Sequence, residues 1–156
     1  MTISIRAVQA ADLANVVVLV TDVLAEFGLT FGNGSATDDE LRDLPQSYVA
    51  RGGAFWVAAL DGELVGTCGV FPVAGAPTTF ELRKMYLRPA TRGLGVGTQL
   101  LATAIAWSRG QGATQIVLDT VEQMTRAITF YEAHGFVRDD AQVRGARCSR
   151  GYTLAL

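Results

Sequence analysis

The chain has 156 residues, of which 49% are hydrophobic and 18% are charged, and its formal net charge at pH 7 is −2. This composition excludes a disordered chain and is sufficient for one domain with a buried core. The negative balance also argues against a nucleic-acid partner, because proteins that bind nucleic acids normally carry an excess of basic residues.

The chain contains few of the residues that build metal centres, and no marker of secretion. Cys68 and Cys148 do not form a C-x-x-C pair and His134 is the only histidine, so we expect no metal site. We expect Cys68 to be a buried strand residue and His134 to interact with a helix C-terminus. The first residues lack the apolar run of a signal peptide, and the apolar stretch at 16–20 is too short to cross a bilayer. A cytoplasmic protein that does not bind membranes is therefore expected.

Hydrophobic periodicity and turn residues divide the chain into short helices and strands. In chain order, the predicted elements are a strand at 3–7, a helix at 13–27, a short helix from 38, strands at 55–60, 63–71 and 78–87, a helix at 96–109, a strand at 116–118, a helix at 125–134, and closing strands at 136–137 and 151–156. Residues 28–37 predict a loop, with Thr37 as the N-cap of the short helix that follows. Pro45 either ends that helix or begins a second one.

Turn residues fix two of the connections. Asp61-Gly62 lies between two apolar runs, which is a strong signal for a β-hairpin. Gly135 is placed to close the helix before it in a left-handed conformation. No repeat or linker divides the chain, so we expect a single domain over residues 1–156. The order of elements predicts an α/β fold with one mixed sheet.

A glycine-rich turn, Gly93-x-Gly95-x-Gly97, separates a predicted strand from a predicted helix. Glycine allows positive φ and a close approach of the backbone to a ligand, and the first amides of a helix have no internal partners. Together with the helix dipole, these amides favour a phosphate or pyrophosphate, and Arg92 can add a charged contact. The alternative is a tight turn whose glycines serve packing only.

A dinucleotide is one candidate ligand for such a turn. Its fingerprint is G-x-G-x-x-G with an acidic residue roughly 20 positions further on. Thr98 stands where the last glycine would be, although Asp119 is near the position of the acid. Dinucleotide folds usually open with this turn, whereas here it lies past the middle of the chain and behind a hairpin. A dinucleotide-binding oxidoreductase domain is therefore the less favoured reading.

Two stretches of the sequence resemble signatures of the GNAT superfamily of N-acetyltransferases. The pattern R-x-x-G-x-G, which begins at Arg92, is similar to the R/Q-x-x-G-x-G/A signature, and residues 81–89 resemble the strand that leads into it. Downstream, the pattern A-I-x-F-Y-E-x-x-G-F of residues 127–136 resembles the second signature. The two occur in the right order and spacing, and the resemblance covers at least residues 54–137.

The resemblance implies a GNAT-like fold, with a central, mostly antiparallel, splayed sheet flanked by about four helices, and acetyl-CoA (coenzyme A) as the acyl donor. In that family a bulged strand binds the pantetheine arm like an added strand, which here corresponds to Met85, Tyr86 and Leu87. The turn would bind the pyrophosphate through Arg92, Gly93, Leu94, Gly95, Val96, Gly97 and Thr98. Met124 stands where the family often has an asparagine, which removes one side-chain contact to the cofactor.

The resemblance also implies direct transfer of the acetyl group to an amine in a ternary complex. Tyr131 would protonate the leaving thiolate, because a phenol is neutral at pH 7, although the same position on an apolar helix face suits a core tyrosine. Glu81 is the candidate base, directly or through a water, although it could instead form an ion pair with Arg83. The other candidate bases are Glu26, Asp38 and Glu122.

The acceptor is less well defined by the sequence. Acidic residues at 38–43 would attract a cationic amine, or would only complement a helix N-terminus. The C-terminal arginines are surface residues, contacts to the adenosine phosphate, or contacts to an anionic acceptor; they are Arg138, Arg144, Arg147 and Arg150. We expect a small-molecule or protein amine as the acceptor, and a homodimer. The alternative to an N-acetyltransferase is a non-catalytic domain that binds or senses acyl-CoA.

Overall fold

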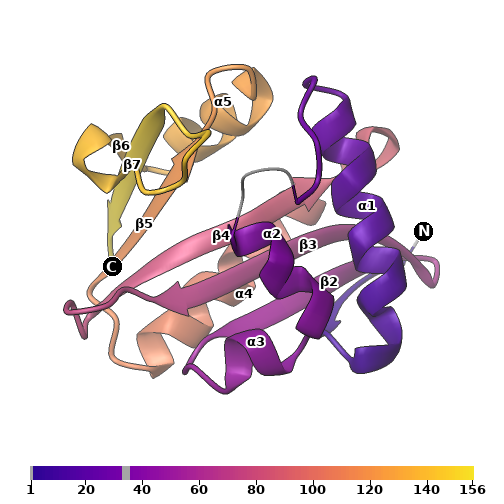
Figure 1. Cartoon of the computed structure of the whole chain (residues 1–156), viewed down its shortest axis with the longest axis horizontal. Helices are drawn as coiled ribbons and strands as arrows, with labels where there is room; N and C mark the ends of the chain where they lie inside the picture. Colours follow the sequence, from indigo (N-terminus) through magenta and orange to yellow (C-terminus); the bar gives the residue numbers. More distant parts are fainter. Residues whose placement is uncertain (1, 33–35) are drawn as a thin grey trace.

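In residues 2–32 and 36–156, which are the residues that the structure describes, a mixed sheet of seven strands runs through the computed structural model (Figure 1). The strands lie in the order β1-β2-β3-β4-β5-β7-β6. Their bounds are β1 (Ile3–Ala7), β2 (Ala54–Leu60), β3 (Glu63–Pro72), β4 (Thr79–Leu87), β5 (Gln115–Thr120), β6 (Val137–Arg138) and β7 (Arg150–Ala155). The helices are α1 (Leu13–Ala25), α2 (Ala36–Asp39), α3 (Gln46–Val49), α4 (Val96–Gly110) and α5 (Thr125–Ala133). Short 3₁₀ turns span Ala10–Asp12, Glu40–Asp43, Pro89–Thr91 and Asp140–Gln142.

The strand pairing confirms the predicted α/β fold with a mostly antiparallel mixed sheet. Within the described ranges, every neighbouring pair of strands is antiparallel except β4 and β5, which are parallel. The described residues form five α-helices, one more than the approximate number that the resemblance implied. The additional one is the short helix α3, whose N-cap is Pro45. Of the two predicted roles for Pro45, the structure therefore shows the one in which it begins a second short helix.

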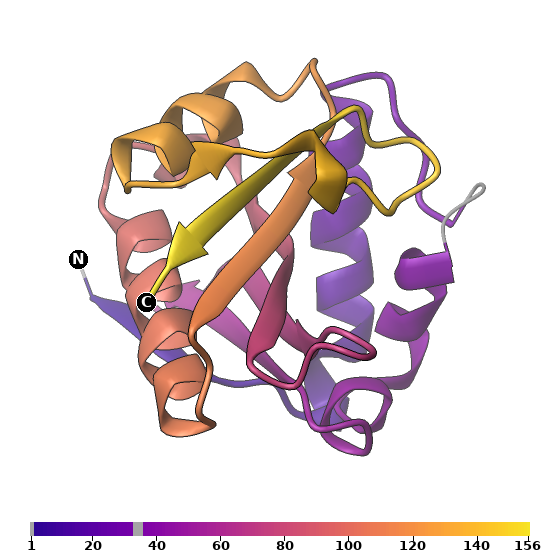
Figure 2. The ribbon, with the colours of Figure 1, turned by 90° about the vertical axis from the view of Figure 1, so that its left-hand side faces the viewer.

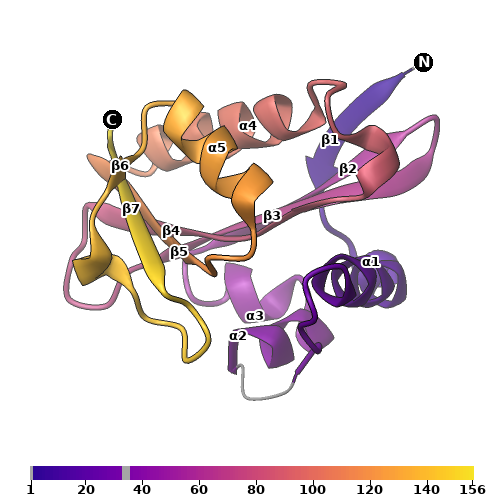
Figure 3. The same cartoon turned by 90° about the horizontal axis from the view of Figure 1, so that it is seen from above.

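The helices cover both faces of the sheet (Figure 3). Helices α1, α2 and α3 lie on one face, and α4 and α5 lie on the other. Leu100, Leu101 and Ala104 of α4 are at most 2% exposed against the sheet, and Val16 and Val20 of α1 are fully buried. The β-branched run in α1 does not prevent the helix, since burial of one face outweighs its weak helix propensity. In the described ranges, every helix lacks the combination of length and apolar character that a bilayer span requires.

Strands β4 and β5 pair only at their beginnings and then part. The parallel register runs from Thr79 with Gln115 to Glu81 with Val117, and Figure 1 shows the two strands diverging beyond it. In the described part of the chain, the β5-facing edge of β4 has no strand partner after Glu81. Backbone groups along this edge are therefore available to an extended ligand. This is the splayed sheet that the resemblance implied.

Strand β4 also carries a bulge at the point where it parts from β5. Thr67 of β3 pairs with Tyr86, whereas Gly69 pairs with Arg83, so β4 has one extra residue in between. Lys84 has a φ of 54°, which is uncommon for a residue other than glycine, and its carbonyl accepts a 2.7 Å hydrogen bond from the Thr67 hydroxyl. The bulge turns the second half of β4 away from the regular ladder.

The C-terminal strand β7 lies within the sheet, beside β5 (Figure 2). Its register with β5 runs from Gln115 with Ala155 to Thr120 with Arg150. The segment that connects β6 to β7 therefore reaches the end of β5, where β4 and β5 are furthest apart. As a result, this C-terminal segment borders the opening in the sheet.

The local turn predictions were confirmed at the hairpin and wrong at the second helix. Asp61 and Gly62 have φ values of 51° and 87°, both left-handed as a two-residue hairpin turn requires. Thr37 is not the N-cap of α2, because that helix already begins at Ala36. Residues 33–35 of the predicted loop lie outside the described residues.

Candidate active site

A cleft of about 710 Å³ opens where β4 parts from β5. The end of β4, the glycine-rich turn, the start of α4 and one face of α5 line it. Of the residues predicted to bind the cofactor, the first cleft brings together Met85, Tyr86, Leu87, Arg92, Gly93, Gly95, Val96, Gly97 and Thr98. Leu94 is not among the lining residues and is 39% exposed. The cleft thus combines an unpaired strand edge with a helix N-terminus.

The glycines of the turn serve two different purposes. Gly93 and Gly95 both have a φ of 84°, a conformation that a side chain would strain, and Gly95 is the N-cap of α4. A Cβ at Gly97 would lie 3.1 Å from Leu87 and 3.3 Å from Phe130, so this glycine permits close packing. The first two glycines shape the turn, and the third lets α4 approach β4 and α5. Gly93 and Gly95 therefore form the tight turn that both interpretations of the sequence require.

Arg92 is held in place by α1 and by the end of β4. Its guanidinium donates two hydrogen bonds of 2.9 Å to the carboxylate of Glu26 and one of 3.0 Å to the carbonyl of Leu87. The bidentate pair fixes the guanidinium at the rim of the first cleft. Glu26, which the sequence leaves as an alternative base, is therefore the partner of Arg92 at the first cleft and does not line the second cleft.

Tyr131 lies between the first cleft and a second one. It lines both, together with Met85, Tyr86, Met124 and Ala127. Tyr131 is 6% exposed, and burial raises the pKa of its phenol above the ordinary value of 10. None of the hydrogen bonds found among the described residues uses the Tyr131 hydroxyl. The phenol is therefore protonated at neutral pH and is positioned where the two clefts meet.

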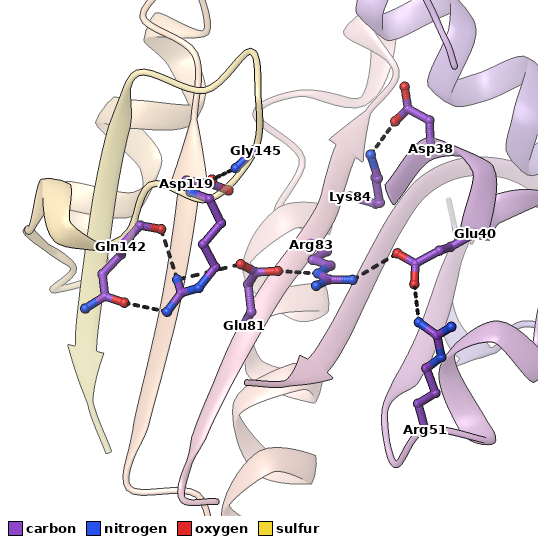
Figure 4. Close-up of polar contacts among 10 residues, drawn as sticks. Asp38, Glu40, Arg51, Glu81, Arg83, Lys84, Asp119, Gln142 and Gly145 are labelled. Atoms are coloured by element: carbon purple, nitrogen blue, oxygen red, sulfur yellow. Dashed lines mark hydrogen bonds and ion pairs between the residues drawn. The ribbon is translucent and has the colours of Figure 1, made fainter. Parts of the chain in front are cut away.

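The second cleft has a volume of about 470 Å³ and extends along β4 towards the C-terminal segment. Its wall contains Glu81, which is 5% exposed and hydrogen-bonded to Arg83 through Oε1. The other oxygen, Oε2, lies 3.8 Å from Nη1 of Arg144, which is the unlabelled arginine between Glu81 and Gln142 in Figure 4. The ion pair with Arg83 that the sequence offered as an alternative is therefore formed, while Oε2 faces the cleft-lining Arg144.

Two ion-pair networks surround the second cleft, and Figure 4 draws the first of them and the Asp38–Lys84 pair of the second. In the first, Arg51, Glu40, Arg83, Glu81 and Arg144 alternate in charge from the 3₁₀ turn after α2 to the C-terminal segment. In the second, the fully buried Asp38 is paired with both Lys84 and Arg147. Of the acidic residues at 38–43, Asp38 and Glu40 are thus each bound by two cations, whereas Asp39 is exposed and paired with Arg42 of the same segment.

The other sequence candidates are distributed around these clefts. Asp119 accepts hydrogen bonds of 2.6 and 2.7 Å from the backbone amides of Arg144 and Gly145. Its carboxylate is therefore engaged in holding a loop, which argues against the dinucleotide reading, in which it would bind a ribose. Glu122 is paired with Arg150 and lies outside the lining of both clefts.

Two residues to which we gave no catalytic role behave as expected. Cys68 is fully buried, and burial raises the pKa of its thiol. His134 lies at the C-terminus of α5, where its Nδ1 is 2.8 Å from the carbonyl of Phe130, and Gly135 follows with a φ of 91°. Sequence reasoning missed Arg126, which lines the first cleft from the first turn of α5. Its only sequence signal is a basic residue near the start of a helix.

Comparisons with known proteins identify the family and the fold of the chain. A family model described as the acetyltransferase (GNAT) family matches residues 21–136. The chain is 37% identical over 124 residues to the uncharacterized N-acetyltransferase YjgM of Escherichia coli, an alignment that covers 78% of this chain and 74% of that protein. A GNAT-family acetyltransferase structure from Staphylococcus aureus Mu50 has a TM-score of 0.89 at 22% identity, with 99% of each chain covered. The PaiA N-acetyltransferase of Thermoplasma acidophilum, solved with coenzyme A, has a TM-score of 0.77 at 19% identity and full coverage of both chains. These two structures share the fold of the chain.

Proposed function

The chain belongs to the acetyltransferase (GNAT) family, and from this premise we propose that residues 1–156 act as one domain that transfers the acetyl group of acetyl-CoA to a primary amine of a small molecule or protein. The observation that carries the proposal is the pair of clefts that meet at Tyr131. One has the backbone features of a coenzyme A site, and the other is lined by charged side chains that suit a polar acceptor.

The first cleft accounts for the binding of acetyl-CoA. The unpaired edge of β4 at Met85, Tyr86 and Leu87 would hold the pantetheine arm, as an added strand is held. The amides from Gly93 to Thr98 would hold the pyrophosphate at the N-terminus of α4. Arg92, fixed by Glu26, supplies a positive charge at the rim. Met124 leaves this arrangement without the side-chain amide that the family often has.

Two side chains of the chain would handle the protons of the reaction. The acceptor amine forms a bond to the acetyl carbon, the carbon–sulfur bond breaks, and the amine loses one proton while the sulfur gains one. Tyr131 is positioned to donate its phenolic proton to the sulfur. Glu81 Oε2, which accepts none of the hydrogen bonds found in the described residues, is positioned to take the amine proton directly or through a water. A backbone amide of β4 would stabilise the oxyanion.

We also propose that the protein is cytoplasmic and forms a homodimer. Cys68 and Cys148 are both free thiols, in keeping with a reducing compartment. Strand β6 lies at an edge of the sheet and exposes 66% of Val137, which supports pairing between two copies. Light scattering during gel filtration would test this, because a mass near 16.6 kDa rather than twice that value would contradict the dimer.

The proposed activity is tested by following the release of the coenzyme A thiol with a chromogenic disulfide. We expect release to depend on both acetyl-CoA and a primary amine, and mass spectrometry to find one acetyl group on the amine. Acetyl-CoA binding without release with any amine would instead favour a non-catalytic acyl-CoA-binding domain.

A further inference from the structure

The positive charge of the second cleft exceeds what its carboxylates balance. Four cationic side chains line the cleft, whereas the acidic side chains that line it are Glu81 and Asp119. The cationic residues are Arg83, Lys84, Arg144 and Arg147. Three further residues form ion pairs within the same networks without lining the cleft, namely Asp38, Glu40 and Arg51. With these included, the described residues supply five cations and four carboxylates. An uncompensated positive charge in a partly buried site favours an anionic ligand.

The two ion-pair networks show where this excess lies. The network through Glu81 contains three arginines and two glutamates, and its last member is Arg144. The network through Asp38 contains two cations for one carboxylate, and its last member is Arg147. Each network therefore has one cation more than it has acids, and Asp119, which belongs to neither network, offsets one of these two charges. Both end on an arginine of the segment between β6 and β7.

The backbone of this segment is fixed, so the two arginines are held at the cleft. Asp119 accepts hydrogen bonds from the amides of Arg144 and Gly145, and the amide of Ser149 donates a 3.0 Å bond to the carbonyl of Thr120. The Arg144 side chain donates to the backbone and side-chain oxygens of Gln142 at 2.9 and 3.0 Å. The guanidinium groups are therefore already partly ordered. Less conformational entropy is lost when they bind a ligand, which favours binding.

The contacts found among the described residues leave N–H donors of both guanidinium groups unused. Arg147 uses Nη1 for the carbonyl of Thr30 at 3.3 Å and Nη2 for Asp38 at 3.2 Å. Arg144 lies 3.8 Å from Glu81, which is beyond hydrogen-bond distance, and its side chain is 38% exposed. An arginine has five N–H donors in a planar fork that matches a carboxylate. Both side chains thus retain donors that a carboxylate in the cleft can accept.

We infer that the acceptor is a small amine that also carries a carboxylate, of the free amino-acid type, whose carboxylate binds Arg144 and Arg147. This inference rests on the proposed function and names the substrate class of that site. In such a molecule the amine and the carboxylate are joined by a short carbon chain. A carboxylate on Arg144 therefore leaves the amine close to Glu81, whose Oε2 lies 3.8 Å from Nη1 of Arg144, in the cleft that Tyr131 also lines. Simple cationic amines lack the group that would neutralise the cleft.

The experiment compares each of the twenty common amino acids with its carboxamide as acceptor, with thiol release as the readout. The carboxamide keeps the primary amine and the carbon skeleton and replaces the carboxylate with a neutral group; because this also lowers the pKa of the amine, kcat/KM is compared for the neutral amine of each acceptor. We expect kcat/KM to be at least roughly tenfold higher for the preferred amino acid than for its carboxamide, which is the effect of a charged hydrogen bond. Arg147→Gln and Arg144→Gln should each raise KM for that amino acid roughly tenfold to a hundredfold and leave KM for the carboxamide unchanged.

Controls separate this inference from the proposed function. Arg109→Gln removes one positive charge from the exposed last turn of α4, outside both clefts, and should change neither KM. Calorimetry should give the same acetyl-CoA affinity for wild type and all three variants; a wild type that binds no acetyl-CoA would instead remove the proposed function. Arg144→Gln keeps the Asp38 network intact, so a folding defect in Arg147→Gln would not decide the outcome. The inference would be overturned if carboxamides, simple amines or peptide N-termini were equal or better acceptors. It would also be overturned if no amino acid in the panel were acetylated.

Discussion

Oε2 of Glu81 and Nη1 of Arg144 face each other at 3.8 Å in the wall of the second cleft. Glu81 belongs to the last pair of residues at which β4 is still joined to β5, and Arg144 belongs to the segment that borders the opening. The proposed proton acceptor and one proposed carboxylate-binding residue therefore share one space. A single small molecule can reach both, which connects the chemistry of the site to its specificity.

Glu81→Gln should lower kcat for acetyl transfer by roughly a hundredfold or more, because glutamine cannot take up the amine proton. The affinity for acetyl-CoA should stay unchanged, since Glu81 lines only the second cleft. Steady-state thiol release and calorimetry measure the two quantities. Glu63→Gln, at the exposed start of β3, is the matched control and should retain full turnover. Equal turnover in the Glu81 variant would remove this residue from the mechanism.

Tyr131→Phe should lower kcat by roughly tenfold to a hundredfold without changing the free energy of unfolding, because it removes a proton donor whose hydroxyl makes none of the hydrogen bonds found in the described residues. Tyr152→Phe is the contrasting variant. The Tyr152 hydroxyl donates a 2.8 Å hydrogen bond to Glu132, so its loss should cost about 1 kcal/mol of stability and leave kcat unchanged. Urea denaturation and steady-state kinetics on both variants would test this, and an unchanged kcat in Tyr131→Phe would exclude the phenol as the acid.

The pH dependence of kcat gives a second test of Tyr131. Because burial raises the pKa of its phenol, the folded protein keeps the proton at every pH up to the ordinary value near 10. We therefore expect no loss of kcat between pH 7 and about 9.5 that depends on this hydroxyl. The profiles of wild type and Tyr131→Phe should be parallel over this range. A fall in wild-type kcat that Tyr131→Phe lacks would contradict the assignment.

Gly95→Ala should destabilise the protein by about 1–2 kcal/mol, since its φ of 84° strains a residue with a Cβ. Gly110→Ala is the matched control at the other end of α4. Gly110 has no positive φ and open space at its Cβ, so alanine should be neutral or stabilise by up to about 1 kcal/mol. Urea denaturation of both variants measures the difference. Equal effects at the two positions would contradict a turn that depends on glycine.

Asp38→Asn should destabilise the protein by about 3–5 kcal/mol at pH 7, because it leaves Lys84 and Arg147 without their shared carboxylate. Burial alone would raise the pKa of Asp38, but the ammonium of Lys84 and its hydrogen bond lower it below the ordinary value. The carboxylate therefore stabilises the fold above about pH 4, and this contribution is lost as the pH falls through the lowered pKa. Urea denaturation from pH 7 down to pH 3 should show that the difference in free energy of unfolding between wild type and Asp38→Asn becomes smaller below pH 4. A constant gap would contradict the pairing.

The sequence was informative where local rules decide the structure. The Asp61-Gly62 hairpin and the turn at Gly93 and Gly95 depend on backbone conformations that few residues tolerate, so the residue types themselves predict them. The helix predicted at 96–109 followed from hydrophobic spacing, and its apolar residues Leu100, Leu101 and Ala104 pack in the core. The strand bulge was implied by the family resemblance alone, because Lys84 gives no local signal for a positive φ.

The second cleft depends on contacts between distant parts of the chain. Arg144 is positioned by Asp119, 25 residues away, and Arg147 by Asp38, 109 residues away. No spacing rule connects such pairs, so the C-terminal arginines could not be divided from sequence into surface and cleft residues. The acids near residue 40 were ambiguous for the same reason, since their cationic partners come from β4 and from the C-terminal segment.

The most direct test of the central claim is a calorimetric titration of the protein with acetyl-CoA, coenzyme A and NAD, beside a Gly95→Trp variant. Gly95 lines the first cleft and has open space around its Cβ, so an indole there would occupy the proposed pyrophosphate site. Gly110→Trp places the same group at the far end of α4 as a control. We predict micromolar binding of acetyl-CoA and coenzyme A by wild type and Gly110→Trp, no binding by a folded Gly95→Trp, and no binding of NAD. Acetyl-CoA binding that persists in Gly95→Trp, or a wild type that binds NAD and not acetyl-CoA, would contradict the account.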